Sequence, residues 1–301
     1  MTAADPSIAP PTAASGPSAA AQLRARLAQD GLLIVPGVHD MIAALLAKQT
    51  GFEFIYGSGF WLTASCHGLP DAGIVGYAEM KERMATLVQA AGPHVIADAD
   101  TGYGGLLNVH HTVRGYEELG VAAIQLEDQV FPKRCGHTPN RPVIPVGEMV
   151  EKIQVACEAR RSAETLIIAR TDAREQEGLA AAIDRAQAYG AAGADMLFIE
   201  GLPDAVEMQR ACTEVTGLMM ANMSHGGYTP MLPVQALEDL GYACAIYPAL
   251  TGLVSAYAIK RALEHLHGGE ATPDIGVADF REFCEMIGFP EVWAFDEKWA
   301  R

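Results

Sequence analysis

The segment Val95-Ile-Ala-Asp-Ala-Asp-Thr-Gly-Tyr-Gly104 contains the pattern that decides the fold. A short apolar run ends abruptly in two aspartates and a group of glycines, as a buried strand does where it meets a polar loop. The run is continuous rather than alternating, which is typical of parallel strands buried on both faces. Seven further runs of this kind follow the same pattern: Leu32–Val35, Phe52–Tyr56, Ala122–Leu126, Leu166–Ala169, Met196–Ile199, Leu218–Ala221 and Cys244–Tyr247.

Helical patterns separate these runs, for example at Met41–Thr50, Leu179–Ala192 and Pro233–Leu240. Eight repeats of strand and helix predict an α/β fold of the TIM (β/α)8 barrel type, with an open doubly wound sheet as the alternative. We predict that the barrel covers residues 23–268. It would follow a disordered tail, rich in Ala, Pro and Ser, at residues 1–22, and precede a C-terminal helical extension at residues 269–301.

Composition narrows the class of partner. The chain has 301 residues, of which 50% are hydrophobic, and its formal net charge is -16. Such an acidic surface repels nucleic acid and anionic membranes, which favours a small-molecule partner. The sequence has no apolar stretch long enough for a membrane span and no signal-peptide pattern. Its six cysteines lack the spacing of a zinc site or a disulfide framework, so we expect reduced thiols and a cytoplasmic location.

Polar side chains follow the predicted strands at one end. The carboxyl ends of barrel strands form the active-site face, so a barrel would gather these residues around one mouth. The segments concerned are Gly57-Ser58-Gly59, Asp98 to Gly104, Glu127-Asp128-Gln129, Arg170-Thr171-Asp172, Glu200 and Asn222.

The segment Lys133-Arg134-Cys135-Gly136-His137 lies just beyond the fourth of these strand ends. A thiolate is the reactive form of cysteine, and nearby positive charge stabilises it. The arrangement predicts a reactive thiol that exchanges a proton near neutral pH. The alternative is a solvated basic loop with an incidental cysteine.

Several strand-end residues suit metal and anion binding. Asp98 and Asp100 are two apart, which on an extended segment puts both on one side, and Glu127 is a further hard oxygen ligand. Mg2+ takes only one or two protein carboxylates directly. The alternative is that D-x-D is a common loop motif that caps a helix. The Ser58 turn can hold a carboxylate or be a plain turn. Arg170 either bridges nearby acids or binds an oxyanion through its fork.

Taken together, these segments resemble the isocitrate lyase and phosphoenolpyruvate mutase superfamily, from about residue 30 to residue 268. The matching stretches are Tyr56-Gly-Ser-Gly59, Gly68-Leu-Pro-Asp71, Asp98-Ala-Asp-Thr-Gly-Tyr-Gly104, Leu126-Glu-Asp-Gln129, Lys133-Arg-Cys-Gly-His137, Ala169-Arg-Thr-Asp172 and Ala221-Asn222. The resemblance implies a barrel whose last helix swaps onto a neighbouring subunit, in a homotetramer that is a dimer of dimers. It also implies Mg2+, with Mn2+ as a substitute.

The resemblance further implies roles for individual residues. The metal would lie among Asp71, Asp98, Asp100 and Glu127. The substrate would contact Ser58, Gly59, Phe60, Gly136, Arg170, Glu200 and Asn222. The catalytic residues would be Cys135, Tyr56, Arg170, His137 and Lys133, with Cys135 and Gly136 on a mobile loop.

These roles imply a carbon–carbon lyase that cleaves a small 2-hydroxy dicarboxylate, a substituted malate or a methylisocitrate-like acid, by retro-aldol chemistry. Tyr56 would accept the hydroxyl proton, Mg2+ and Arg170 would stabilise charge on the α-oxygen, and Cys135 would protonate the departing fragment. The alternatives are an oxaloacetate hydrolase or oxo-acid decarboxylase, a carboxyphosphonoenolpyruvate phosphonomutase-type enzyme, and a non-catalytic barrel that binds a dicarboxylate.

Some positions depart from the family pattern. Methylisocitrate lyases usually carry an arginine after the eighth strand for a third carboxylate, whereas Ala249-Leu-Thr-Gly-Leu-Val254 is uncharged. The tail residue Arg281 matches another family arginine only loosely. His225 stands near a position where the family often has Glu, and either alters specificity or caps a helix. With the aromatic bulk of Phe60 and Trp61, these departures favour a substrate with two carboxylates over one with three.

Overall fold

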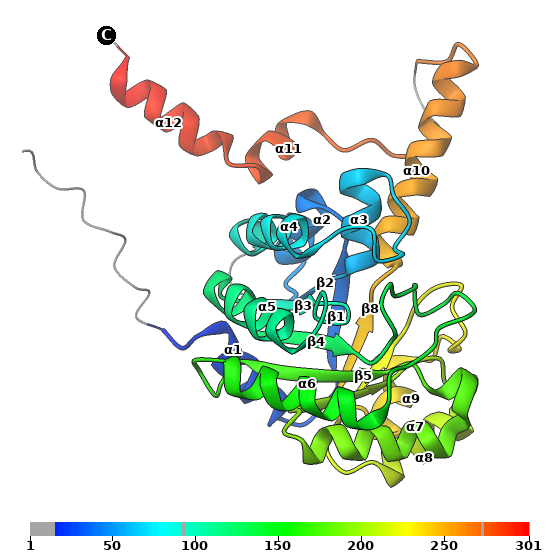
Figure 1. Cartoon of the computed structure of the whole chain (residues 1–301). Helices are drawn as coiled ribbons and strands as arrows, with labels where there is room; N and C mark the ends of the chain where they lie inside the picture. Colours follow the sequence, from blue (N-terminus) through cyan, green and yellow to red (C-terminus); the bar gives the residue numbers. More distant parts are fainter. Residues whose placement is uncertain (1–15, 92–93, 272–273, 301) are drawn as a thin grey trace, which may run out of the picture.

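A computed structural model describes residues 16–91, 94–271 and 274–300. Its strands close into a parallel barrel in which each strand pairs with the next along the chain and the last pairs with the first (Figure 1). All eight predicted strands are present and the (β/α)8 prediction is confirmed, while the alternative of an open sheet is wrong. The strands are β1 Leu33–Val38, β2 Ile55–Gly57, β3 Val95–Asp98, β4 Ala123–Glu127, β5 Leu166–Thr171, β6 Met196–Ile199, β7 Leu218–Asn222 and β8 Cys244–Tyr247.

The strands read as continuous apolar runs because both of their faces are buried. Successive side chains of a strand point to opposite faces. In β3, Ile96 joins the cluster inside the barrel with Phe198 and Ile246, whereas Val95 and Ala97 join the larger cluster between the strands and the outer helices. One short segment therefore contributes to two cores, which leaves only its C-terminal end for polar residues.

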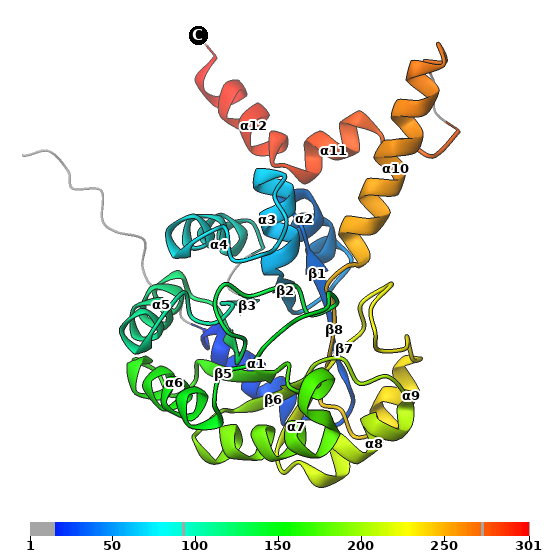
Figure 2. The same cartoon turned by 45° about the vertical axis from the view of Figure 1, so that its right-hand side comes forward.

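Helices surround the strands and cover the outer core (Figure 2). In α4, for example, Met80, Met84, Leu87 and Val88 recur at helical spacing and are buried. The helices of this ring are α2 Met41–Gln49, α4 Tyr77–Ala91, α5 Leu106–Leu119, α6 Val146–Ala159, α7 Arg174–Ala191, α8 Ala205–Glu214 and α9 Val234–Asp239. A short helix, α3 Gly59–His67, follows β2 directly.

The helix α1 Ala19–Leu27 packs against the residues inside the barrel. Ser18 begins it by accepting a hydrogen bond from the backbone of Ala21, and Leu23 is fully buried. The prediction of a disordered tail over residues 1–22 is therefore wrong for its last part, because Ala19 and Ala20 gain buried contacts that composition alone does not reveal. Residues 1–15 of the predicted tail lie outside the described residues.

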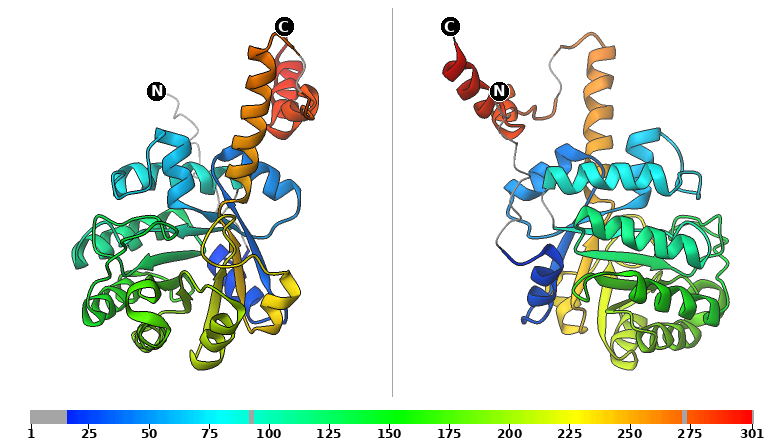
Figure 3. Two further views of the ribbon diagram at one scale, coloured as in Figure 1. Left: turned by 90° about the vertical axis from the view of Figure 1, so that its right-hand side faces the viewer. Right: turned by 60° about the vertical axis from the view of Figure 1, so that its left-hand side comes forward.

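Three C-terminal helices form an arm that projects from the barrel (Figure 3). They are α10 Leu250–His267, α11 Phe280–Met286 and α12 Phe289–Trp299. Only Gly252 of α10 is buried, and α12 buries no residue against its own chain. None of the helices within the described ranges is long and apolar enough to cross a membrane. A swap of the last helix between subunits remains a prediction.

Candidate active site

The polar strand ends meet around one cavity of about 320 Å³ at the mouth of the barrel. Of the residues predicted from the sequence, twelve line it: Tyr56, Ser58, Phe60, Asp71, Asp98, Lys133, Cys135, Gly136, His137, Arg170, Glu200 and Asn222. Gly59, Asp100 and Glu127 lie behind this lining, where Gly59 donates its backbone N–H to Asp98 Oδ2 at 3.0 Å. The structure thus brings together residues from β2, β3, β4, β5, β6 and β7 and from the Lys133–His137 loop.

Four carboxylates, those of Asp71, Asp98, Asp100 and Glu127, form an acidic cluster, and Lys133 lies at its centre. Its Nζ lies 2.6 Å from Asp71 Oδ2 and 2.7 Å from Asp100 Oδ1, and its side chain is almost fully buried. Asp98 and Asp100 adjoin each other, but not because they lie on an extended segment. Asp100 has a φ of 48°, and its backbone N–H turns back to Asp98 Oδ1 at 3.2 Å.

The acidic cluster carries more negative charge than its one lysine neutralises. Burial raises the pKa of Asp100 to about 7, although Lys133 opposes this. Burial also raises the pKa of Glu127 well above its usual value, with Arg170 opposing. Asp100 and Asp71 raise the pKa of Lys133 in spite of its burial, so this amine stays charged. A further cation would relieve the remaining repulsion.

The donor set fits Mg2+ rather than an ion that needs a full set of protein ligands. The donors are carboxylate oxygens, and Glu127 Oε1 is buried without a hydrogen-bond partner. In the described parts of the chain, no three His, Cys, Asp or Glu side chains converge closely enough to hold an ion by themselves. Mg2+ keeps several waters and takes one or two carboxylates directly, so this looser arrangement suits it.

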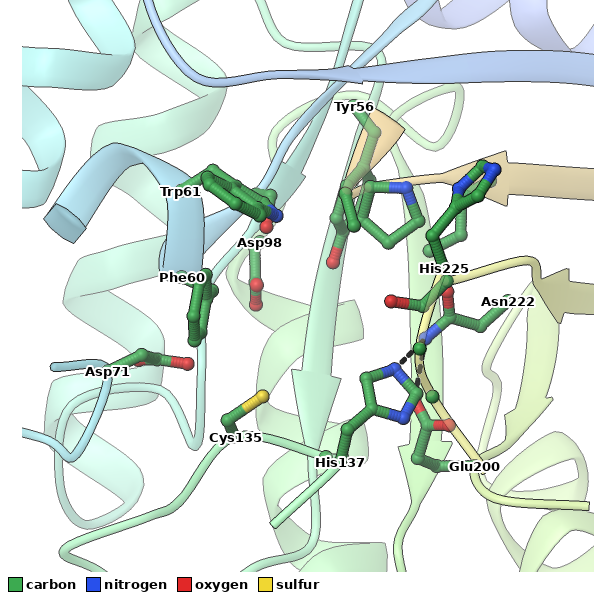
Figure 4. A pocket seen from close by; sticks show the side chains of 18 of the residues that line it. Tyr56, Phe60, Trp61, Asp71, Asp98, Cys135, His137, Glu200, Asn222 and His225 are labelled. Carbon is green, nitrogen blue, oxygen red and sulfur yellow. Dashed lines mark hydrogen bonds between the residues drawn. The ribbon is translucent and has the colours of Figure 1, made fainter. Parts of the chain in front are cut away.

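The Cys135 loop lies over the cavity, and its sulfur points into it (Figure 4). The flanking cations make their direct contacts elsewhere: Lys133 pairs with the acids, and Arg134 donates to the backbone carbonyls of Ala72, Pro132 and Lys133 at 3.0–3.3 Å. Burial raises the pKa of Cys135, and a hydrogen bond from the His137 backbone and the charges of Arg170 and Lys133 only partly offset this. Lys133 thus favours the thiolate as expected, but burial outweighs it and favours the protonated thiol.

A chain of polar side chains lies across the cavity from Phe60 and Asp71 (Figure 4). It consists of Glu200, Asn222 and His137. Asn222 Nδ2 donates to Glu200 Oε2 at 2.8 Å and lies 3.3 Å from His137 Nε2. Glu200 Oε1 accepts the backbone N–H of Gly201 at 2.8 Å. Asn222 Oδ1 and His137 Nδ1 are buried without a partner, and both residues line the cavity. They are available to hydrogen-bond with a ligand.

Arg170 bridges nearby acids, which is the first of the two roles that its sequence position allowed. Its fork donates to Asp172 twice, from Nε to Oδ2 and from Nη2 to Oδ1, each at 2.9 Å. Nη1 lies 3.3 Å from Glu127, and Nη2 lies 3.6 Å from Glu200. The guanidinium is thus bridged from behind by carboxylates while it lines the cavity, where it can meet an anion.

Tyr56 is buried at the base of the cavity. Burial, followed by the charge of Asp98, raises the pKa of this phenol well above its usual value, and Arg170 opposes this. In these surroundings Tyr56 is a neutral hydrogen-bond donor. Its predicted role as a proton acceptor depends on an additional cation nearby and stays a prediction.

The cavity also has an apolar wall, and the sequence pointed to only part of it. Phe60 and Trp61 were noted, and their rings meet edge to face with centroids 5.1 Å apart. Ile246, Pro248 and Leu253 also line the cavity and were missed as site residues. Their position in the sequence could have identified them, because the end of the eighth strand must lie at the same mouth of the barrel as the ends of the other seven.

Comparison with known proteins gives consistent matches along most of the chain. The family model for phosphoenolpyruvate phosphomutase matches residues 23–267. A 2,3-dimethylmalate lyase from Eubacterium barkeri is 41% identical over 285 residues, which cover 93% of this chain and 98% of that protein. A 2-methylisocitrate lyase from Bacillus subtilis (strain 168) is 40% identical over 284 residues, covering 94% of this chain and 93% of the relative.

Solved structures agree with the sequence relatives. Oxaloacetate acetylhydrolase in complex with the inhibitor 3,3-difluorooxalacetate superposes with a TM-score of 0.87 at 32% identity, covering 93% of this chain and 97% of that one. A crystal structure described as 2,3-dimethylmalate lyase, a PEP mutase/isocitrate lyase superfamily member, gives a TM-score of 0.87 at 30% identity, covering 95% and 96%. The chain therefore belongs to the phosphoenolpyruvate mutase/isocitrate lyase superfamily.

Proposed function

We propose that this protein is a Mg2+-dependent carbon–carbon lyase that cleaves an alkyl-substituted 2-hydroxy dicarboxylate of the 2,3-dimethylmalate class. The observation that carries the proposal is one cavity that combines charged groups, Arg170 and the acidic cluster, with apolar side chains that include Trp61 and Leu253. A diacid with alkyl branches has both kinds of group. The 2,3-dimethylmalate lyase and 2-methylisocitrate lyases among the relatives support this reading.

Each residue has a role in the proposed cleavage. The Ser58 turn and Arg170 bind the carboxylate next to the hydroxyl group, and Asn222 with Glu200 holds the other carboxylate end through its hydrogen-bond network. As the hydroxyl loses its proton, the carbon–carbon bond breaks and its electron pair passes to the carbon beside the departing carboxylate. The protonated thiol of Cys135 then supplies the proton to that carbon. For 2,3-dimethylmalate the products are pyruvate and propionate.

The metal would be held by Asp98 and Asp100, with Asp71 and Glu127 acting through water. Bound Mg2+, or Mn2+ in its place, polarises the oxygen on which negative charge develops. Lys133 keeps two of these carboxylates in position, and the loop that carries it excludes water from the reacting centre. Tyr56 is the proposed acceptor of the hydroxyl proton once this cation is present.

Hydrolysis of oxaloacetate to oxalate and acetate is the second candidate. The similarity to oxaloacetate acetylhydrolase, with a TM-score of 0.87, favours it. The same Arg170 and acidic cluster would bind the keto acid, and a water molecule would replace the aldol chemistry. The apolar wall argues for the lyase, because oxaloacetate has no alkyl branch to bury there.

The C-terminal arm supports a proposal about assembly. Its exposed apolar side chains include Ile259 at 56%, Leu263 at 59% and Leu266 at 62% exposure, which recur at helical spacing on one face of α10. A contiguous patch of this kind on an ordered helix usually marks an interface. We propose that a second copy of this chain covers it in a dimer of dimers.

All six cysteines are free, in keeping with a reducing cytoplasm as the proposed compartment.

A substrate panel tests the proposed function. The purified protein is incubated with Mg2+ and, separately, with 2,3-dimethylmalate, 2-methylisocitrate, isocitrate, malate and oxaloacetate, and the products are identified by NMR. Pyruvate and propionate from 2,3-dimethylmalate are expected. Oxalate and acetate from oxaloacetate alone would favour the hydrolase, and binding of all five acids without turnover would leave a dicarboxylate-binding barrel. Formation of a phosphonate from phosphoenolpyruvate would instead indicate a mutase.

A further inference from the structure

Arg141 is among the largest fully buried side chains of the described residues, yet it does not line the cavity. It stands at the base of the loop that carries Cys135. That base is closed by a hydrogen bond from the Val130 N–H to the Pro142 carbonyl at 2.8 Å and by an isolated bridge between Gln129 and Val143. Arg141 therefore lies at the point at which the loop rejoins the barrel.

The guanidinium of Arg141 shares an oxygen atom with the guanidinium of Arg170. Nη1 of Arg141 donates to Asp172 Oδ1 at 2.7 Å, and Nη2 of Arg170 donates to the same atom at 2.9 Å. Asp172 is fully buried, and its backbone N–H donates to Asp128 Oδ1 at 2.9 Å. Because both guanidinium groups donate to the same carboxylate oxygen, each helps to set the orientation of the carboxylate that holds the other.

Two further contacts hold Arg141 from other segments. Its Nη2 and Nε donate to Glu175 Oε2 at 2.8 and 3.2 Å, at the start of α7. The ring of Tyr228, on the loop after β7, lies 5.7 Å from the guanidinium carbon. Arg141 thus connects the Cys135 loop, the end of β5, the start of α7 and the loop that follows Asn222.

We propose that Arg141 is a positioning residue: through Asp172 it fixes the orientation of the Arg170 guanidinium whose cavity side meets the substrate anion, and it links that orientation to the seating of the Cys135 loop. The link to turnover rests on the proposed function, whereas the link to anion binding does not. A lysine at this position would keep the charge but lose the planar fork that reaches Asp172 and Glu175 together. The Asp172 carboxylate could then rotate, and Arg170 with it.

The test compares Arg141→Lys with a matched control, Arg174→Lys. Arg174 also makes a two-pronged contact to a carboxylate, that of Glu207 at 2.7 and 2.8 Å, at the start of α7, but does not touch Asp172. Oxalate with Mg2+ is the anion probe, titrated by calorimetry, and the melting temperature reports folding. We expect Arg141→Lys to weaken oxalate binding by about 10-fold, or about 1.4 kcal/mol, at one site per chain. Arg174→Lys should bind oxalate as the wild type does.

The outcomes separate the possibilities. A Kd within twofold of the wild-type value in Arg141→Lys would overturn the proposal, as would failure of the wild type to bind oxalate. A purely structural role predicts fewer binding sites and a lower melting temperature, with an unchanged Kd at the sites that remain. If Arg141→Lys does not fold, Tyr228→Leu decides: a Kd raised about threefold supports the proposal, and an unchanged Kd refutes it. Oxalate binding without turnover of any panel acid would refute only the lyase.

Discussion

Gly136 packs directly against the guanidinium of Arg170. A β-carbon added to this glycine would lie 2.2 Å from Arg170 Nη2 and 3.1 Å from Oε2 of Glu200. The Cys135 loop therefore lies directly on the arginine that we propose binds the substrate anion, and only a residue without a side chain allows this approach.

Gly136→Ala should reduce kcat/KM by about 100-fold, because either Arg170 or the loop must move by roughly an ångström and such misplacement is costly in catalysis. The melting temperature should change less than the activity, because residues 138–140 next to Gly136 are exposed and the loop can shift outward to relieve the clash. Gly147→Ala is the control, because a β-carbon there meets nothing within 4 Å. Steady-state kinetics on the best panel substrate provide the measurement, and a Gly136→Ala enzyme with normal activity would show that the loop does not close in this way during turnover.

Cys135→Ser should lower kcat by about 100-fold or more, since a serine hydroxyl is a much weaker acid than a thiol. Mg2+ binding should remain, because the thiol is not part of the acidic cluster. Cys66→Ser, at an exposed cysteine, is the control.

Burial raises the pKa of the Cys135 thiol, and only the protonated form donates. The wild-type kcat should therefore hold through neutral pH and fall only above the usual pKa of a thiol. A fall in kcat below neutral pH that tracks this thiol would contradict the donor role.

Mg2+ should stabilise the fold more at about pH 8 than at about pH 6. The pKa of Asp100 is raised to about 7, above its unfolded value, so in the absence of metal this carboxylate favours the folded state below its unfolded pKa and loses that contribution as pH rises through about 7. At the higher pH the ionised carboxylate is free to attract a cation, whereas at the lower pH a proton competes. The measurement is the difference in melting temperature between Mg2+ and EDTA at each pH. Asp100→Asn should abolish most of the pH dependence of that difference, and an equal difference at both pH values in the wild type would exclude Asp100 from the metal site.

Much of this arrangement follows from local sequence. A strand such as Val95–Asp98 is recognisable because its apolar run and its polar end are adjacent in the chain, and the barrel rule then places Asp98, Glu127, Arg170 and Asn222 at one mouth. The partners of Lys133 were not predictable, because Asp71 is 62 residues away and the choice between pairing with an acid and activating a thiol depends on tertiary geometry. For the same reason the sequence showed the nearby cations, which lower the pKa of Cys135, but not the burial that outweighs them and raises it.

Leu263→Asp on α10 should break the proposed assembly. Leu263 is 59% exposed in the single chain, and a charge buried in a hydrophobic interface without a partner is strongly unfavourable. Leu107→Asp is the matched control, since Leu107 is 81% exposed on α5, away from the arm. Light scattering coupled to size-exclusion chromatography should give a tetramer for the wild type and the control, and a smaller species for Leu263→Asp. A monomeric wild type would refute the assembly proposal.

Leu253→Arg should shift specificity toward a substrate with a third carboxylate. Leu253 lines the apolar wall and belongs to the uncharged stretch after β8, so in the present cavity a third carboxylate would lose its hydration without gaining a partner. A guanidinium at this position supplies that partner and at the same time removes apolar surface for an alkyl branch. We expect the ratio of kcat/KM for 2-methylisocitrate to that for 2,3-dimethylmalate to rise by about 10-fold or more, which corresponds to about 1.4 kcal/mol of discrimination. Leu250→Arg, at a neighbouring α10 position outside the cavity lining, should leave the ratio unchanged. If both variants shift the ratio equally, general electrostatic attraction explains the effect. If neither variant changes the ratio, Leu253 does not face the substrate, and the apolar wall does not determine which of the two acids is cleaved.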